Sequence, residues 1–405
     1  MEKTLKIGIL RETKNPPDRR VPLTPPHIIA LQELYPQLEF YVQPSNIRSY
    51  SDDEFKYLKI PLRENLSNCD ILMGVKEVDK NTLIPDKAYM FFAHVGKGQA
   101  SNRDLLREVI KKGVRLIDFE YLKSENGHRV VAFGRWAGIV GAYNALRARG
   151  IKTNRFKLKP AYLCRDINEM WAGLSLIELN PGLKILITGE GRVTHGAMET
   201  FDRCNVVQIS VEDYITKKFD VPVICSIGPK EYTQHAAGQP FMFKHFNNHP
   251  EEYESTFLPF TKVTDILVTG HYWKPKSPSF FSREDTSKKD FKISIIADIS
   301  CDIDGPIPCT LRTTSIAEPF YSYNPHLNKE ESAFSNPYNI TVMAVDNLPS
   351  ELPRDSSHDF GTQLMENVMP ELITGDKEGM IKHATITKGG KLTTGFSYLR
   401  EYLGQ

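Results

Sequence analysis

Short apolar runs alternate with amphipathic segments through most of this chain, and this alternation limits the fold more than any other feature. The first apolar run, Leu5–Leu10, precedes a helix signal in which Thr24 is the N-cap and Pro25 takes the first helical position. Ser51 and Glu54 form a capping box before a second helix. Strands and helices that alternate in this way are typical of βα units around a parallel sheet. The sequence therefore predicts an α/β protein.

The alternation falls into two series, which predicts at least two domains for a chain of 405 residues. In the first series we expect a helix from Asn102 to Gly113 and strands at Cys69–Val75, Ala88–Ala93, Val114–Phe119 and Val130–Phe133. The small-residue-rich segment Ala137–Arg149 is expected to form a helix that crosses between the domains. The strands of the second series carry consecutive Val and Ile, as strands buried on both faces do: Leu183–Thr188, Val206–Ser210, Val221–Ile227, Asp265–Thr269, Lys292–Asp298 and Thr341–Asp346.

These two series set the expected domain boundaries. A substrate-binding and catalytic domain is expected at residues 1–136, and a dinucleotide-binding domain at residues 137–349. The remaining residues, about 350–405, hold helical patterns at Gln363–Ile373 and Thr394–Leu403 and are too few for a domain of their own. They are expected to complete the first domain. Lys274–Asp290 is polar and contains Pro and Ser, which predicts a surface connection.

Charge and composition exclude several classes of partner. Fifty-one Lys and Arg residues against 50 Asp and Glu leave a formal charge of +1, with no basic excess to offset a phosphate backbone. No run approaches the ~18 apolar residues of a membrane span, and the N-terminus lacks the apolar stretch of a secretion signal. We therefore expect a cytoplasmic protein that binds small molecules and neither nucleic acid nor membrane. Its oligomeric state stays open.

The cysteines and histidines predict no metal site. The six cysteines are scattered without a CxxC pair, which favours buried thiols over a disulfide framework or a zinc site. His245 and His249 have a spacing that some zinc sites use, but no cysteine partners accompany them.

A glycine-rich turn follows the strand Leu183–Thr188 and leads into a helix. Gly189 and Gly191 let the backbone fold tightly and approach a pyrophosphate. The helix that begins near Arg192 and Val193 offers free N–H groups and a positive partial charge to the same anion. The turn therefore predicts a dinucleotide site, and the alternative is a tight turn that holds no ligand.

This turn departs from the usual G-x-G-x-x-G pattern. Thr194 stands in place of the third glycine, and the next glycine, Gly196, comes two positions later.

The choice between NAD and NADP stays open. An acidic residue that binds a ribose hydroxyl is expected about 20 positions after the first glycine. The second strand ends at Ser210, with Glu212 and Asp213 just beyond it. Arg192 or Arg203 would equally suit a 2′-phosphate.

Two strand ends of the first series carry candidate acid–base groups. Lys76 and Glu77 follow one apolar run, and His94 follows the next. Loss of hydration at a strand end lowers the pKa of an ammonium group, and histidine exchanges protons near neutral pH. Such a pair suits proton transfer during imine chemistry. The alternative is a solvated Lys76–Glu77 ion pair and a hydrogen-bonded core histidine.

Further charged residues of the first domain are candidates for binding substrate. Arg19, Arg20 and Arg129 suit carboxylate groups because the guanidinium fork matches that geometry, although solvated surface arginines are the alternative. Glu120 is a candidate for tuning the acid–base pair or binding an amine. Gln99 is also placed in the predicted substrate-binding set.

Longer strings around these residues resemble a known superfamily. The alanine dehydrogenase and transhydrogenase superfamily has an N-terminal domain similar to the strings Asp18–Pro25, Gly74–Glu77 and Phe91–His94. Its saccharopine branch, which contains saccharopine dehydrogenases and lysine–ketoglutarate reductases, is similar to the strings Arg115–Glu120 and Arg129–Gly138. Three later segments agree with this branch: Gly270–Trp273, Ala297–Asp302 and Val345–Pro353.

The resemblance implies a fold, a cofactor and a reaction. The implied fold is α/β, with two Rossmann-like domains whose parallel sheets are separated by an interdomain cleft. The implied cofactor is NAD or NADP. The implied reaction is the reversible joining of L-lysine and 2-oxoglutarate into saccharopine.

The resemblance also implies roles for individual residues. The acid–base pair matches Lys76 and His94, and the acidic residues that tune it match Glu77 and Glu120. The ligands of the substrate carboxylates match Arg20 and Arg129. The pyrophosphate turn matches Gly189, Gly191 and Gly196, and the segment near the nicotinamide matches Asp346, Asn347 and Leu348.

Other functions remain open on the sequence alone. An alanine dehydrogenase, or an opine-type N-carboxyalkyl amino acid dehydrogenase, would use pyruvate in place of 2-oxoglutarate. A non-catalytic nucleotide-binding module is the alternative from a different class. The physiological direction, towards lysine synthesis or degradation, also stays open.

Overall fold

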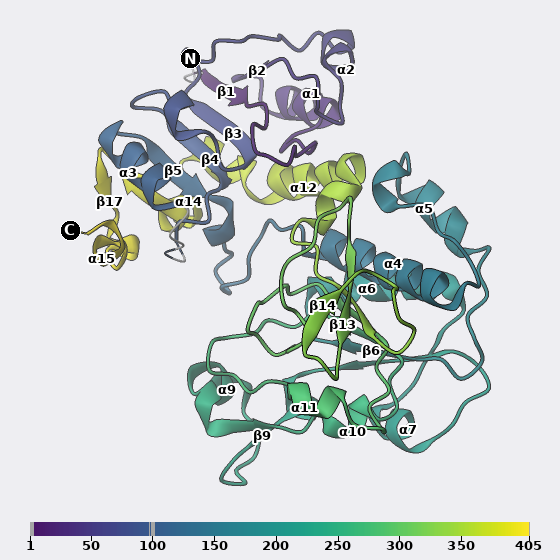
Figure 1. Ribbon diagram of the computed structural model, residues 1–405. Coiled ribbons are helices and arrows are strands. Elements are labelled where there is room, and N and C mark those ends of the chain that lie inside the picture. Colours follow the sequence, from purple (N-terminus) through teal and green to yellow (C-terminus); the bar gives the residue numbers. More distant parts are fainter. Residues whose placement is uncertain (1–3, 97, 99–101, 405) are drawn as a thin grey trace. The chain divides into compact units, whose positions relative to one another are not determined.

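The computed structural model describes residues 4–96, 98 and 102–404, and the chain divides into two compact units. Unit 1 comprises Met1–Phe133 and Pro353–Gln405, and unit 2 comprises Gly134–Leu352. Figure 1 shows that unit 1 combines the purple and blue start of the chain with its yellow end. Each unit is built around one large sheet.

Unit 1 contains a seven-stranded sheet in the order β17-β16-β5-β4-β3-β1-β2. Five strands are parallel: β1 (Leu5–Ile9), β2 (Leu38–Val42), β3 (Ile71–Lys76), β4 (Ala88–Phe92) and β5 (Arg115–Asp118). The C-terminal hairpin adds β16 (Thr385–Lys388) and β17 (Lys391–Leu392), which are antiparallel. The sheet is therefore mostly parallel, with an antiparallel edge that the sequence did not predict.

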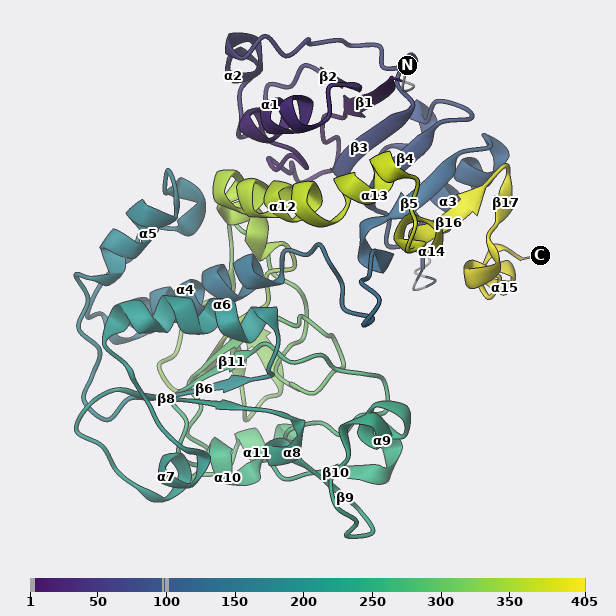
Figure 2. The same ribbon diagram turned by 180° about the vertical axis from the view of Figure 1, so that it is seen from behind.

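Helices cover both faces of this sheet. One face buries the core around Phe40, Met90 and Phe119 and is covered by α1 (Pro25–Leu34), α12 (Pro353–Asn367), α13 (Met369–Thr374) and α14 (Met380–Ala384). The other face buries Leu72 and Phe91 under α3 (Arg103–Lys111) and α15 (Leu399–Leu403). Figure 2 shows α12 and α13 following one another along unit 1. The C-terminal helices thus complete the core of the first unit.

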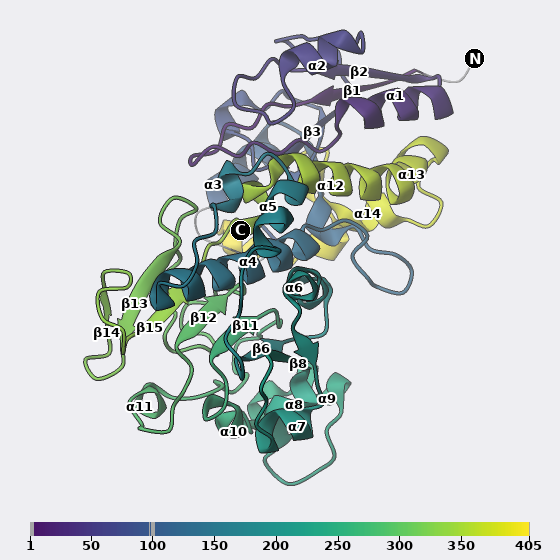
Figure 3. The ribbon, with the colours of Figure 1, turned by 90° about the vertical axis from the view of Figure 1, so that its right-hand side faces the viewer.

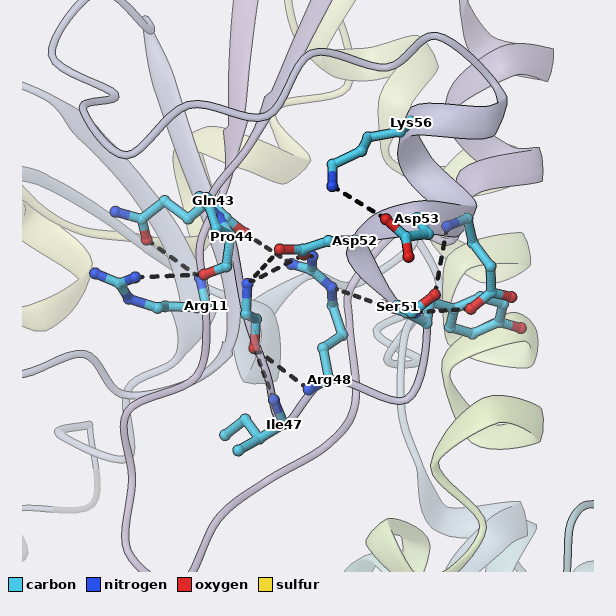
Figure 4. A network of polar contacts seen from close by, with 12 residues as sticks. Arg11, Gln43, Pro44, Ile47, Arg48, Ser51, Asp52, Asp53 and Lys56 are labelled. Atoms are coloured by element: carbon cyan, nitrogen blue, oxygen red, sulfur yellow. Dashed lines mark hydrogen bonds and ion pairs between the residues drawn. The ribbon is translucent and has the colours of Figure 1, made fainter.

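A polar network fixes the loop between β2 and α2 (Asp52–Tyr57) in unit 1 (Figure 4). Arg48 Nη2 donates to Asp52 Oδ1 at 2.6 Å. The same loop is also hydrogen-bonded to the segment that carries Arg19, one of the predicted substrate-binding residues. Ser49 N donates to the carbonyl of Arg19 at 2.8 Å, and Arg19 Nε donates to the carbonyl of Ile47 at 3.3 Å.

Unit 2 contains an eight-stranded sheet in the order β14-β13-β15-β12-β11-β6-β8-β7. Its parallel strands are β6 (Lys184–Thr188), β7 (Val207–Gln208), β8 (Val223–Ile227), β11 (Ile266–Thr269), β12 (Ile295–Asp298) and β15 (Ile340–Met343). The edge strands β13 (Phe320–Asn324) and β14 (Lys329–Glu331) are antiparallel. Figure 3 shows β13, β15, β12, β11, β6 and β8 following one another across the sheet.

Two helix layers bury the sheet of unit 2. One face is covered by α4 (Gly134–Thr153), α5 (Ile167–Leu174) and α6 (Arg192–Phe201), and the other by α7 (Val211–Thr216) and α10 (Leu258–Thr261). A smaller excursion from this second face holds α8 (Pro229–Tyr232), β9 (Thr233–His235), α9 (Phe243–Asn248) and β10 (Tyr253–Ser255). The central strands are therefore buried on both sides, as their continuous apolar sequence predicts.

Glycines allow α4 and α6, which lie side by side in Figure 2, to pack closely. A Cβ atom on Gly138 would lie 1.9 Å from the carbonyl oxygen of Val193, and one on Gly196 would lie 1.9 Å from that of Arg135. Neither backbone can yield without moving a helix. Gly196 is therefore required for the packing of the two helices, whatever else it does.

We expect Gly196→Ala to lower the free energy of unfolding of unit 2 by about 1–3 kcal/mol, the usual cost of overpacking. Gly173→Ala in α5 is the matched control, because its Cβ would meet nothing nearer than 3.6 Å. It should raise stability by about 0.5–1 kcal/mol through helix propensity. All three tryptophans, Trp136, Trp171 and Trp273, belong to unit 2, so their fluorescence in a urea titration reports its unfolding. Equal midpoints for the two variants would contradict this account.

Local expectations from the sequence are met in part. The capping box is confirmed, because Ser51 Oγ accepts the N–H of Glu54 and Glu54 Oε2 accepts that of Ser51. The strand expected at Val130–Phe133 is wrong. Val130 N donates to the carbonyl of Leu122, and Ala132 N donates to the side chain of Gln363, so these N–H groups join no sheet. 

The segment expected to be a surface connection is more ordered than predicted. Lys274–Asp290 contains α11 (Arg283–Thr286), and Phe280 and Phe281 within it are buried. Its aromatic side chains join the core of unit 2.

All six cysteines are free thiols, and five of them are buried; Cys301 is half-buried. Within residues 4–96, 98 and 102–404, no helix has the length and apolar character needed to cross a membrane.

Candidate active site

Three neighbouring strands of unit 1 deliver titratable side chains to one edge of its sheet. Since β3, β4 and β5 are parallel, their carboxyl ends meet at the same edge. Lys76 is the last residue of β3, His94 follows β4 by two residues, and Asp118 is the last residue of β5. His94 has a φ of 53°, a left-handed conformation that is uncommon for a non-glycine residue and that is often found at functional sites.

Lys76 lies among charged and buried groups. Burial lowers the pKa of its ammonium group, and the positive charge of Arg20 lowers it further, while Asp18 opposes them. Glu12 fixes the end of the strand, because its carboxylate accepts the N–H of Val75 at 2.6 Å and of Lys76 at 3.0 Å. Burial raises the pKa of Glu12 itself to about 7. The site therefore favours a neutral Lys76 amine more than water does.

Glu77 connects His94 to a second lysine. His94 Nδ1 lies 3.4 Å from Glu77 Oε2, an ion-pair separation that is longer than a normal hydrogen bond. Lys14 contacts the other carboxylate oxygen. Burial acts to raise the pKa of Glu77, but its interactions with His94 and Lys14 outweigh burial and lower that pKa to about 2. Glu77 therefore stays ionised near neutral pH, where it can stabilise a protonated imidazole.

Asp118 is a further carboxyl group at this edge that the sequence analysis did not single out. Its side chain is fully buried, and burial raises its pKa to about 7. Its Oδ1 accepts the N–H of Glu120 at 2.9 Å, while Oδ2 has no hydrogen-bond partner among the described residues. The charge of His94 acts on it in the opposite sense to burial. A carboxyl group close to neutral pKa thus lies near the candidate histidine.

The structure holds Arg20 inside unit 1. Its Nε and Nη2 donate to Asp18 at 3.0 and 2.6 Å, and its guanidinium lies 4.2 Å from the ring centroid of Phe133. Arg20 is buried, so much of its hydrogen-bonding capacity is used within the protein. It acts on Lys76 through its charge.

The other predicted substrate residues lie in different settings. Arg19 is exposed and donates to the carbonyl of Ile47. Arg129 Nη2 lies 3.8 Å from Glu120 Oε1, so these two predicted residues pair with one another. Gln99 lies outside the residues that the structure describes.

The glycine turn of unit 2 fits a pyrophosphate. Gly189 has a φ of 104°, its N–H donates to the carbonyl of Ile227 at 2.8 Å, and a Cβ there would lie 2.6 Å from the carbonyl oxygen of Gly270. Gly191 is the N-cap of α6, and the space where its Cβ would stand is open for 4 Å. An open position in front of a helix N-terminus of ten residues is suited to an anion.

The residues that follow explain the imperfect glycine pattern. Arg192 and Val193 are the first two residues of α6. Thr194 is buried, and its hydroxyl donates to the carbonyl of Thr188 at 3.4 Å, which ties the helix to the end of β6. Gly196 faces α4, as described above. Thr194 therefore stands where the third glycine of the usual pattern would be, and its hydrogen bond to Thr188 keeps the turn closed.

The strand order differs from that of a usual Rossmann sheet at the place where the ribose site is expected. β8 lies between β6 and β7, so Ser210, which follows β7, is separated from the glycine turn after β6 by one intervening strand. Ser210 Oγ accepts the N–H of Asp213 at 3.2 Å and caps α7. Beside the turn, a Cβ on Gly228 would lie 2.5 Å from Glu190 Oε1. The carboxylate of Glu190 therefore lies against the end of β8.

The last predicted cofactor residues follow β15, whose carboxyl end lies at the same sheet edge as the glycine turn. Asp346 is exposed, Asn347 is half-buried and Leu348 is buried in the core. Leu348 therefore positions its neighbours rather than presenting its own side chain.

A cavity of about 760 Å³ in unit 1 lies elsewhere, lined by residues such as Arg115, Glu371, Lys382 and Thr385. Lys76, Glu77 and His94 do not line it. The candidate site therefore rests on the charged cluster at the sheet edge and on the glycine turn.

Comparison with known proteins gives three kinds of match. Residues 8–140 match the family model of the alanine dehydrogenase/PNT N-terminal domain. An alpha-aminoadipic semialdehyde synthase of Arabidopsis thaliana is 28% identical over 97% of this chain and 41% of its own length. A saccharopine dehydrogenase [NAD(+), L-lysine-forming] of Emericella nidulans is 27% identical over 90% of this chain and 91% of its own. The resemblance found in the sequence is confirmed.

The chain spans less than half the length of the semialdehyde synthases that it matches. Among solved structures, an L-alanine dehydrogenase superposes with a TM-score of 0.63 at 14% identity, covering 99% of both chains. A transhydrogenase from Sinorhizobium meliloti superposes with a TM-score of 0.59 at 13% identity, covering 96% of this chain and 98% of its own. These structures confirm the two-domain, Rossmann-like α/β fold.

Proposed function

We propose that this protein is an amino-acid dehydrogenase that uses NAD or NADP and acts on the CH–NH bond of saccharopine, interconverting saccharopine with L-lysine and 2-oxoglutarate. The observation that carries the proposal is the contact between His94 and Glu77 beside the half-buried Lys76. The match to saccharopine dehydrogenases over about nine-tenths of both chains supports this substrate.

The reductive direction needs both a base and an acid. The ε-amine of lysine must be neutral to add to the keto carbon of 2-oxoglutarate. The resulting carbinolamine must gain a proton at its hydroxyl group to lose water and form an imine. Reduction of the C=N bond then gives saccharopine. When bound, the dinucleotide supplies the hydride for this last step.

Lys76 and His94 are suited to these two proton transfers. Because burial and Arg20 lower its pKa, Lys76 is proposed to accept the proton of the substrate ammonium. His94 is proposed to protonate the leaving hydroxyl group through Nε2, since Nδ1 faces Glu77. Glu77 stays ionised and stabilises the charged imidazole that this step requires.

Saccharopine has three carboxylates, which need cationic partners. Arg129 and Arg19 keep part of their guanidinium surface accessible, and Arg129 would exchange its 3.8 Å contact with Glu120 for a substrate carboxylate. Arg20 is proposed to act mainly by setting the charge around Lys76, because its guanidinium is already bound by Asp18.

Unit 2 is proposed to hold the dinucleotide at its glycine turn. Gly191 leaves room for the pyrophosphate. Arg192 and Val193 are the first residues of α6, and their N–H groups are proposed to face this anion. Asp346 and Asn347 are proposed to lie near the nicotinamide, as the family resemblance implies.

An absorbance assay at 340 nm tests the proposed function. Saccharopine with NAD and with NADP should produce the reduced cofactor, and lysine with 2-oxoglutarate should consume it. Parallel reactions with alanine, and with lysine plus pyruvate, test the alanine dehydrogenase and opine-type alternatives that the N-terminal family match leaves open. Cofactor binding without turnover of any substrate would favour the non-catalytic module.

The pH dependence of the reductive reaction should report the environment of Lys76. Since Lys76 must be neutral and His94 must carry a proton, kcat/KM is expected to pass through a maximum as pH rises, and the inflection that reports Lys76 should lie below 10.5, the ordinary lysine value. Lys14→Met removes one nearby positive charge and frees the negative charge of Glu77. Both changes raise the pKa of Lys76, so the inflection is expected to move to higher pH.

Arg20→Met should move the inflection further in the same direction, because Arg20 has the larger influence on Lys76. Arg19→Met is the matched control: its side chain is exposed and donates to the carbonyl of Ile47, so the inflection should stay in place even if the KM for substrate rises. An inflection that is unchanged in the Lys14 and Arg20 variants would show that another group acts as the base.

A further inference from the structure

We propose that Glu190 selects the cofactor of unit 2: its carboxylate binds the adenosine ribose hydroxyls of NAD and repels the 2′-phosphate of NADP. The inference rests on the dinucleotide site of the proposed function and names the residue that decides between its two candidate cofactors. Glu190 lies between Gly189 and Gly191, inside the glycine turn itself. A ribose-binding acid usually comes about 20 positions later, at the end of the neighbouring strand.

The strand whose carboxyl end adjoins the glycine turn is β8. It pairs in parallel with β6 along its whole length, and Figure 3 shows the two strands next to one another. Two hydrogen bonds tie the turn to the end of this strand. The N–H of Gly189 donates to the carbonyl of Ile227 at 2.8 Å, and Ser226 Oγ donates to the carbonyl of Gly189 at 3.4 Å. A dinucleotide whose pyrophosphate lies at the turn therefore has its adenosine ribose at the end of β8.

The end of β8 has no acidic side chain of its own, and Glu190 supplies one. β8 ends at Ile227, and Gly228 and Pro229 follow it. A Cβ on Gly228 would lie 2.5 Å from Glu190 Oε1 and 3.0 Å from its Oε2. Gly228 has a φ of −97° and a ψ of −178°, an extended backbone that any residue can adopt, so its conformation does not require glycine. The missing side chain instead lets the carboxylate of Glu190 lie against the end of the strand.

The carboxylate of Glu190 is available to a ligand. Its side chain is exposed and makes no hydrogen bond or ion pair with another residue that the structure describes. Glu231, the other carboxylate beside Gly228, is used within the protein: Oε2 accepts the N–H of Gly228 at 2.8 Å, and Oε1 lies 3.3 Å from Lys230 Nζ. Of these two carboxylates, that of Glu190 has both oxygens left to accept hydrogen bonds from the two ribose hydroxyls.

The two arginines that the sequence offers to a 2′-phosphate begin or end away from β8. Arg203 follows α6 at the end opposite to the turn, and its guanidinium lies 4.3 Å from the ring centroid of Trp171. Arg192 begins on the side of α4, because its Cβ lies 3.3 Å from the position of a Cβ on Gly134. A 2′-phosphate at the end of β8 would therefore meet the negative charge of Glu190, which disfavours NADP.

Titration of the full chain with NADH and with NADPH, followed by nicotinamide fluorescence, tests the inference without any turnover. We expect the wild type to bind NADH about 10-fold or more tightly than NADPH. Glu190→Ala should weaken NADH binding by about 10-fold and leave NADPH binding equal or tighter, so that the preference is lost. Glu178→Ala is the matched control, because Glu178 is an exposed acid that precedes β6, at the opposite end of the strand from the turn. It should keep the wild-type affinities.

The outcomes separate this inference from the proposed function. It is overturned if the wild type binds NADPH as tightly as NADH or binds neither, or if Glu190→Ala keeps the wild-type preference, whatever the saccharopine assay shows. It is also overturned if Glu212→Ala, which removes the exposed acid after β7, abolishes the preference in place of Glu190→Ala. The expected NADH preference without turnover of saccharopine would support the role of Glu190 and contradict only the proposed substrate. Tryptophan fluorescence in urea checks that each variant keeps unit 2 folded.

Discussion

Replacing Lys76 with methionine, or His94 with glutamine, is expected to lower kcat by about 10²–10⁴-fold, the usual contribution of a positioned acid or base. Methionine keeps the length and apolar stem of the half-buried lysine but cannot take a proton. Glutamine at position 94 keeps a hydrogen-bonding group opposite Glu77 but cannot become charged. If the two groups act in one proton-transfer sequence, the double variant should lose less activity than the sum of the two separate losses.

Dinucleotide affinity distinguishes loss of chemistry from loss of structure. The glycine turn belongs to unit 2 and the acid–base pair to unit 1, so both single variants should bind the reduced dinucleotide about as tightly as the wild type. Lys80→Met is the matched control, because Lys80 is a half-buried lysine of unit 1 that pairs with Asp104 outside the cluster. Full turnover by both Lys76→Met and His94→Gln would refute the assignment.

Much of the fold can be predicted from the sequence because its signals are local. Continuous apolar runs mark the central strands, and the capping box at Ser51 marks the start of α2. Edge strands are harder to recognise. β14 is exposed and polar, and β17 has only two residues, so neither has an apolar run to mark it. Each pairs with the strand just before it in the chain, β13 or β16, so what the sequence lacks here is the apolar signal of a strand and not a nearby partner.

The order of strands in unit 2 shows the same limit. The sequence places Ser210 at the end of the strand that follows the glycine turn, where a ribose-binding acid is usual. In the structure β8 takes the place beside β6, and Glu190 from within the turn lies against its end. Length and apolar character identify β7 and β8 as strands but do not say which one pairs with β6.

Some residues of the candidate site can be recognised from the sequence, and others cannot. Lys76 and His94 are recognisable because each follows an apolar strand. Glu12 is not, because it accepts backbone N–H groups from a strand far along the chain, and Asp118 is not, because its raised pKa comes from burial in the folded unit. His235 and Glu252 approach His245 through the β9–β10 hairpin, a grouping that the spacing of His245 and His249 does not show.

Replacing Gly191 with valine is expected to weaken dinucleotide binding on the order of 100-fold, about 2.8 kcal/mol, while leaving the stability of unit 2 unchanged. The backbone of Gly191 has a φ of −98° and a ψ of −168°, which any residue can adopt, and nothing lies within 4 Å of its Cβ position. The protein itself therefore gives no reason for a glycine here. A bulky side chain would instead occupy the space before the N-terminus of α6, where a pyrophosphate needs to approach the backbone.

The pair of readouts makes this prediction specific. Titration with the reduced dinucleotide, followed by its fluorescence, measures affinity, and tryptophan fluorescence in urea measures the stability of unit 2. Gly196→Ala should lower the stability of unit 2 more than it lowers dinucleotide affinity, because its Cβ meets the backbone of α4. Gly395→Val, at an open position of unit 1, should change neither quantity. If Gly191→Val binds the dinucleotide like the wild type, the turn is a structural connection and the cofactor site must lie elsewhere.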